Sequence, residues 1–73
     1  GNVRLGSTLG ERGTVYVAVP PSGDGSGRVT LVVGGKQREF NATQDGDMMI
    51  PSRARVKVLG VDEAGNTAKV EVV

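Results

Sequence analysis

Short runs of alternating apolar and polar residues fill most of the chain, and glycine or proline separates one run from the next. Alternation with a period of two is typical of β-strands, because successive side chains point to opposite faces of a sheet. The segment 45–55 lacks apolar residues at helical spacing and contains Gly46 and Pro51, which favour a loop. The pattern therefore predicts an all-β fold.

Five strands are predicted, and a sixth short strand could lie at residues 3–9. The five span residues 13–19, 28–33, 36–43, 53–62 and 67–73. The apolar residues that alternate along them should form one core: Val15, Val17, Val19, Val29, Leu31, Val33, Phe40, Ala42, Val56, Val58, Ala68, Val70 and Val72. Tyr16 and Ala18 fall on the other face of the first strand, which predicts that this strand is covered on both sides.

Two glycine positions refine the strand connections. Gly34-Gly35 predicts a two-residue hairpin turn, because both central residues of a type I′ turn need a positive φ. Such a turn places Val29 directly opposite Phe40. Gly60 falls where the alternation of the fourth strand slips, and it indicates a β-bulge that re-aims the side chains. Short strands at this spacing favour a sandwich or a small barrel.

The composition limits the chemistry that the chain can perform. Its 73 residues fit one domain and include neither histidine nor cysteine, which removes the commonest general base, thiolate metal ligands and disulfides. No apolar stretch approaches the roughly 20 residues of a membrane-spanning helix. Nine basic against eight acidic residues give a net charge of +1, which does not favour strong non-specific attraction to nucleic acid or to an anionic membrane.

Residues that could support catalysis or bind a ligand have simpler explanations. The four serines have no histidine to activate them, and the three lysines fall at turn or outward positions. Asp45 and Asp47 flank a glycine, as in a calcium loop, but the terminal glutamate of such a loop is missing, which favours turn capping. The glycine-rich segment 23–27 lacks the Lys-Ser/Thr and the helix of a phosphate-binding loop, so it is expected to be a flexible connection.

A nucleic-acid-binding face is the main alternative function. The basic residues that could form it are Arg28, Arg38, Arg53, Arg55 and Lys57. Single-stranded nucleic acid also needs exposed aromatic side chains for base stacking, and only Tyr16 remains because Phe40 is expected in the core. Outward basic residues that merely face solvent are the favoured interpretation.

The segment Met48-Met49-Ile50 is the one apolar cluster in a predicted loop. It could be an exposed docking surface, since methionine adapts to varied partners. It could also close one end of a barrel. We favour the second interpretation, because so short a chain has few side chains with which to fill a core.

Several segments together resemble the C-terminal soluble domain of NfeD-like membrane proteins. They are residues 10–15 (Gly-Glu-Arg-Gly-Thr-Val), 26–29 (Ser-Gly-Arg-Val), 35–42, and Ile50-Pro51 followed by residues 55–58 (Arg-Val-Lys-Val). The order and spacing of these segments carry the resemblance, which covers residues 10–73. The chain departs from the family pattern at Arg53, where the family has glycine, and at Ala68, where it often has leucine. The turn at Arg53 is therefore expected to differ, and the core at Ala68 to be slacker.

The resemblance implies a small five-stranded OB-like β-barrel without a long helix over residues 10–73. It implies that residues 1–9 form a linker or short strand after a membrane anchor, with this domain soluble and cytoplasmic. The implied partner is a flotillin- or stomatin-like scaffold protein, and the implied role is non-catalytic. No catalytic residue, metal, cofactor, small-molecule substrate or nucleic acid is expected. Binding must then use loops, and Met48, Met49 and Arg53 are the predicted partner-binding residues because interface cores are enriched in methionine and arginine.

Overall fold

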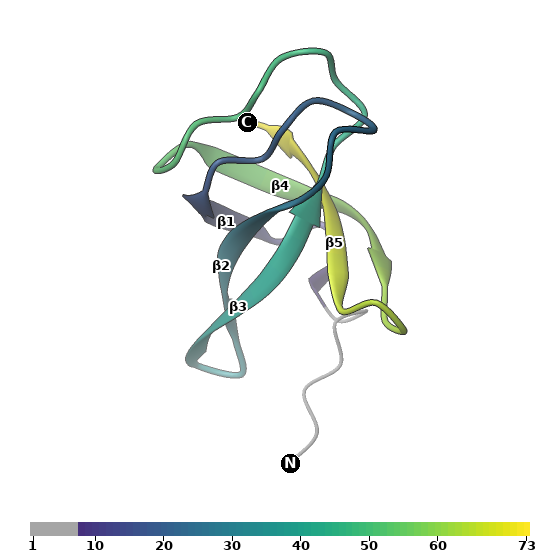
Figure 1. Cartoon of the computed structure of the whole chain (residues 1–73). Helices are drawn as coiled ribbons and strands as arrows, with labels where there is room; N and C mark the ends of the chain where they lie inside the picture. The colour runs from purple at the N-terminus through teal and green to yellow at the C-terminus, as the bar shows by residue number, and fades with distance from the viewer. Residues whose placement is uncertain (1–7) are drawn as a thin grey trace.

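Five strands build the part of the chain that the computed structural model describes, residues 8–73 (Figure 1). They are β1 (Arg12–Val17), β2 (Gly27–Val33), β3 (Lys36–Thr43), β4 (Arg55–Asp62) and β5 (Thr67–Val72). Each of the five predicted strands is present. The predicted sixth strand at residues 3–9 lies mostly outside the described residues. Thr8 and Leu9, which are described, form a turn in which the N–H of Glu11 donates to the Thr8 carbonyl at 2.9 Å.

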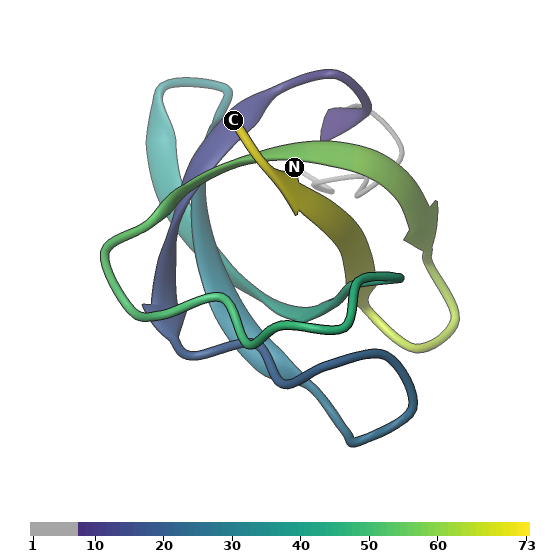
Figure 2. The ribbon, with the colours of Figure 1, turned by 90° about the horizontal axis from the view of Figure 1, so that it is seen from above.

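The strands close into a barrel in the order β1-β2-β3-β5-β4, and β4 pairs back onto β1. Only the β3–β5 pair is parallel. Figure 2 shows the strands as a ring around a common interior. Closure leaves few backbone groups of the sheet unpaired, which protects a small β-protein from pairing edge to edge. The predicted all-β barrel is confirmed. Among residues 8–73 there is no helix with the length and apolar character needed to cross a bilayer.

The β2–β3 hairpin has the predicted turn and register. Gly34 and Gly35 have φ values of 59° and 81°, which residues other than glycine rarely adopt. The turn sets Val33 opposite Lys36 and carries Val29 opposite Phe40. It therefore fixes which residues of β3 face the interior.

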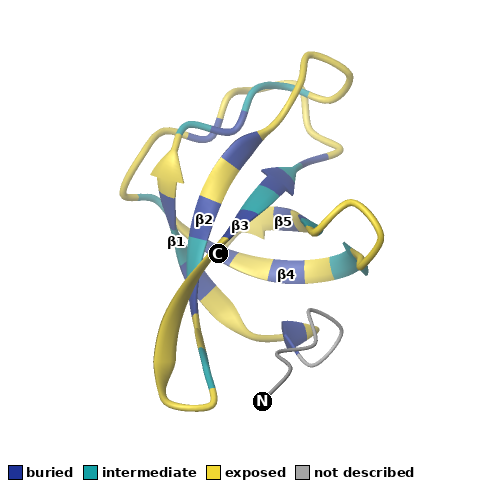
Figure 3. Ribbon diagram, turned by 60° about the horizontal axis from the view of Figure 1, so that its bottom comes forward, coloured by how far each residue is buried: buried dark blue, intermediate teal, exposed yellow. Residues whose placement is uncertain are grey.

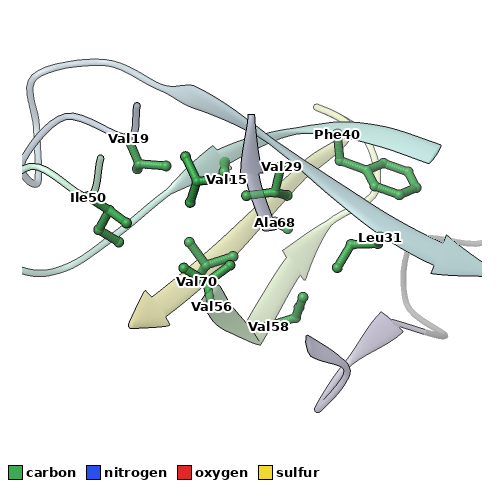
Figure 4. Close-up of a cluster of buried hydrophobic side chains, with 11 residues drawn as sticks. Val15, Val19, Val29, Leu31, Phe40, Ile50, Val56, Val58, Ala68 and Val70 are labelled. Atoms are coloured by element: carbon green, nitrogen blue, oxygen red, sulfur yellow. The ribbon is translucent and has the colours of Figure 1, made fainter. Parts of the chain in front are cut away.

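One cluster of aliphatic side chains and a single phenylalanine fills the barrel (Figure 4). Its members are Val15, Val19, Val29, Leu31, Phe40, Ala42, Ile50, Val56, Val58, Ala68 and Val70. Buried and exposed positions alternate along β2 and β4, as the bands of colour in Figure 3 show. The predicted core is confirmed at ten positions, and Ile50 from the long loop joins it. Val33 packs half-buried at the edge of the cluster.

Two predicted core residues are exposed. Val17 has 46% of its surface exposed, because the β1–β2 ladder shifts register between Val15 and Val17 and turns Val17 outward. Val72 is 61% exposed at the end of β5, although it lies opposite the buried Val56 of β4. Tyr16 is also exposed, so the prediction that β1 is covered on both faces is wrong.

The predicted bulge in β4 is confirmed. The ladder with β5 shifts between Val58 and Gly60, and Leu59 is left outside at 46% exposure. After the bulge, Val61 lies opposite the buried Ala68 and is half-buried against the core. The out-of-phase apolar residues of this strand are thus explained by one extra residue.

Candidate interaction surface

The loop between β3 and β4, residues 44–54, crosses one end of the barrel and is held there by backbone pairing. Ile50 and Val19 exchange two hydrogen bonds, with N–O distances of 2.8 and 2.9 Å. Val19 lies seven residues after Arg12, and Ile50 lies seven residues before Lys57. The bridge is therefore in the same antiparallel register as the Arg12–Lys57 pair of β1 and β4. The second half of the loop therefore continues beside the end of β1. Ile50 is buried and closes the interior at this end.

A buried glutamine, Gln44, fixes the first half of the loop. Its side-chain Nε2 donates to the carbonyl oxygens of Met48 at 2.8 Å, Val19 at 3.0 Å and Pro20 at 3.1 Å. Only 8% of the residue is exposed. One amide thus links the loop to the backbone of Val19 and Pro20. Gln44 was not predicted as a site residue, because nothing in the local sequence pattern distinguishes it from a solvated loop residue.

The two methionines of the loop lie on the surface. Met48 is 81% exposed and Met49 is 58% exposed. The prediction that the whole cluster closes the barrel holds for Ile50 and is wrong for both methionines. Met48 and Met49 are therefore solvent-exposed apolar side chains on a loop whose backbone is held by hydrogen bonds at Met48 and at Ile50.

Arg53 adopts a left-handed backbone conformation, with φ at 74°. Its N–H donates to the Val15 carbonyl at 2.7 Å, and its side chain is exposed. The turn thus has the backbone that glycine prefers, although this chain carries arginine there. The left-handed region is unfavourable for residues with a Cβ atom.

Arg53→Gly should raise the free energy of unfolding by about 0.5–1 kcal/mol, because relief of the left-handed backbone exceeds the added entropy of glycine in the unfolded chain. Urea unfolding of the two proteins measures the difference. Asn66→Gly is the matched control, since Asn66 also has a positive φ, of 52°, but asparagine tolerates it well. A loss of stability in Arg53→Gly would show that the arginine side chain stabilises the turn.

The predicted basic residues separate in the structure. Arg28 pairs with Glu39 at 3.7 Å, and Arg38 lies on the β2–β3 hairpin. Arg53, Arg55 and Lys57 follow one another on the side of the barrel next to β1. The structure adds Arg12, directly opposite Lys57, to this group.

The other candidate ligand residues do not gather into a site in the described part of the chain. Asp45 forms an ion pair with Lys69 at 3.3 Å. No group of three or more carboxylates that could hold a metal ion occurs within residues 8–73. Lys36, Lys57 and Lys69 are all exposed. The acidic tip between β4 and β5 is a turn in which Asp62 Oδ1 accepts a hydrogen bond from the N–H of Gly65 at 3.2 Å.

Known structures share this arrangement, although no family model and no curated protein matches the chain in sequence. The soluble domain of the NfeD protein YuaF from Bacillus subtilis aligns with a TM-score of 0.73 and 23% identity, over 92% of this chain and 75% of that one. The C-terminal domain of stomatin operon partner protein 1510-C from Pyrococcus horikoshii aligns with a TM-score of 0.67 and 22% identity, over 92% and 89%. The chain has the fold of an NfeD soluble domain.

A third protein extends the likeness. The soluble domain of a membrane protein implicated in regulation of membrane protease activity, from Corynebacterium glutamicum, aligns with a TM-score of 0.66 and 22% identity, over 90% of this chain and 92% of that one. The NfeD-like fold implied by the sequence segments is therefore confirmed.

Proposed function

We propose that this chain is the non-catalytic interaction domain of an NfeD-like membrane protein, on the cytoplasmic side, and that it binds a stomatin- or flotillin-like scaffold. Support comes from the fold shared with the soluble domain of an NfeD protein, the soluble domain of a membrane protein and the C-terminal domain of a stomatin operon partner protein. The chain has no histidine or cysteine, the side chains most used for acid–base and nucleophilic catalysis. Binding is the function that its remaining chemistry suits best.

The observation that carries the proposal is the pair of exposed methionines on an anchored loop. Met48 and Met49 would gain free energy by leaving water at an interface. Gln44 and Ile50 already hold the loop, so a partner would have little backbone left to order. Arg53, exposed at the far end of the same loop, supplies a charged group of the kind that is enriched at interfaces.

Met49→Asp should weaken scaffold binding at least tenfold, which corresponds to about 1.4 kcal/mol, because it places a charge in an apolar contact. Stability should change little, since Met49 is mostly exposed. Recovery of the scaffold by co-purification from membranes, at equal expression, measures the effect. Arg53→Glu should act in the same direction, whereas Arg53→Lys, which keeps the charge, should retain binding.

Val32→Asp is the matched control for Met49→Asp. Val32 is 65% exposed but lies on the β2–β3 hairpin, at the opposite end of the barrel from the loop (Figure 1). Scaffold recovery should stay normal in this variant. Unchanged recovery with Met49→Asp, or equal losses in both variants, would remove the loop as the binding surface.

A further inference from the structure

Three cationic side chains form a compact group on the outer surface of β1 and β4, which we call the cationic face: Arg12, Arg55 and Lys57. Arg12 lies directly opposite Lys57, and Arg55 lies opposite Thr14 two positions along. All three are exposed, while the intervening Val56 is buried. The alternation of β4 and the register with β1 therefore direct the three charges to the same side of the sheet.

The cationic face carries an excess of positive charge, because only Lys57 has a carboxylate, that of Glu71, directly opposite it on a neighbouring strand. In the described part of the chain, ion pairs join Arg28 to Glu39 and Lys69 to Asp45, and neither includes a member of the face. Glu71 of β5 stands opposite Lys57 and bounds the face on that side. Like charges directly opposite one another on neighbouring strands repel, and an anionic partner would relieve that repulsion. The nearly neutral net charge of the chain thus conceals an uneven distribution.

A shallow hollow of about 440 Å³ opens beside the arginines of the face. Its lining includes Arg12, Arg55, Thr14, Thr30 and Gln37. Guanidinium groups bind phosphate oxygens through paired N–H donors, and hydroxyl and amide groups add further donors. The two guanidinium groups, the Thr14 hydroxyl and the Gln37 amide suit a phosphate group, whereas the Thr30 hydroxyl already donates to the Thr14 carbonyl at 3.3 Å.

We propose that the cationic face docks the domain onto the anionic phospholipid headgroups of a membrane. The inference rests on the proposed function in one respect, namely that the domain is held near a bilayer. Each basic residue near an anionic surface strengthens binding about fivefold, so the two arginines, which Glu71 does not offset, give an effect of roughly 30-fold. That is weak for a free protein but enough to orient a tethered domain, whose effective concentration at the surface is high.

The two methionines lie toward the opposite end of β1 and its extension from Arg12, whereas Arg53 of the loop lies two residues from Arg55 of the cationic face. Arg12 and Val19 are separated by seven residues of β1 and its extension, which is about 20 Å. The methionines lie at the Val19 end. A nucleic acid is the less suitable partner, because Tyr16 is the only exposed aromatic residue on β1 and one ring makes no stacking platform.

Vesicle flotation of the purified chain at low ionic strength tests this proposal. The chain should float with vesicles of phosphatidylcholine mixed with phosphatidylglycerol and remain unbound with phosphatidylcholine alone. Arg12→Gln/Arg55→Gln should reduce the partition coefficient roughly 30-fold. Lys36→Gln/Arg38→Gln removes the same net charge from the hairpin, and it should reduce partitioning by less than about fivefold.

Three results would overturn the proposal. The first is an equal loss in both double variants, which would mean that net charge alone drives binding. The second is equal binding to neutral and anionic vesicles. The third is capture of the chain by a single-stranded oligonucleotide that anionic vesicles cannot displace. Met49→Asp should leave vesicle binding intact, so failure of the scaffold interaction is distinguished from failure of membrane docking.

Discussion

Phe40→Ala is expected to lower the free energy of unfolding by about 3–5 kcal/mol, a large share of the stability of so small a domain. Phe40 is the only phenylalanine of the chain and the largest side chain in the core, with 6% of its surface exposed. Its position opposite Val29 in the β2–β3 ladder prevents the surrounding strands from closing the space that its ring would leave. The cost therefore includes a cavity as well as lost burial.

Urea unfolding followed by circular dichroism measures this effect. Phe40→Leu is the control, because it keeps most of the buried apolar surface and should cost about 1–2 kcal/mol. If Phe40→Ala remained folded with near-normal stability, the barrel interior would have to be organised around other side chains.

Gln44→Leu is expected to cost about 2–3 kcal/mol, because it removes three side-chain hydrogen bonds while preserving the side-chain bulk. The Val19 carbonyl keeps the hydrogen bond from the Ile50 N–H at 2.8 Å, so the loss falls mainly on the carbonyls of Pro20 and Met48. The loop that carries Met48 and Met49 would lose its anchor at the same time. Partner binding should therefore weaken even though neither methionine is altered.

Gln44→Glu gives this prediction a pH dependence. At neutral pH the introduced carboxylate would face carbonyl oxygens instead of donating to them, and burial adds a further penalty, so its pKa in the folded state should be raised. Protonation restores one donor. The variant should therefore be most stable at acidic pH, below the pKa of an unfolded glutamate, and lose stability as the pH rises through the raised value. Urea midpoints that did not change with pH, relative to the parent chain, would contradict the role assigned to Gln44.

The period-two pattern and the Gly34-Gly35 turn sufficed to predict the strands, the hairpin register and most of the core. These features depend on neighbours in sequence or on one tight turn. Val17 was misplaced because a register shift interrupts the alternation, and Val72 because it is the last residue of β5 and is left uncovered. Alternation predicts the face of a strand on which a residue lies, but not how far the neighbouring strands extend to cover it.

The candidate surfaces could be predicted only in part. Met48, Met49 and Arg53 stood out by their composition in a loop, yet their exposure depends on how Ile50 pairs with Val19. Gln44 reaches a backbone 24 and 25 residues away, which no local pattern encodes. The cationic face likewise needs the register between β1 and β4, which brings Arg12 to Lys57 across a long sequence separation.

Photo-crosslinking from Met49 tests the proposed scaffold-binding surface most directly. A photoreactive amino acid introduced at Met49 in cells should crosslink the full-length protein to a stomatin- or flotillin-like scaffold, because the exposed loop would lie in the interface. The same group at Val32, which is also mostly exposed but lies on the hairpin, should give no such product. Absence of a scaffold crosslink from Met49, or equal crosslinking from Val32, would contradict the proposed binding surface.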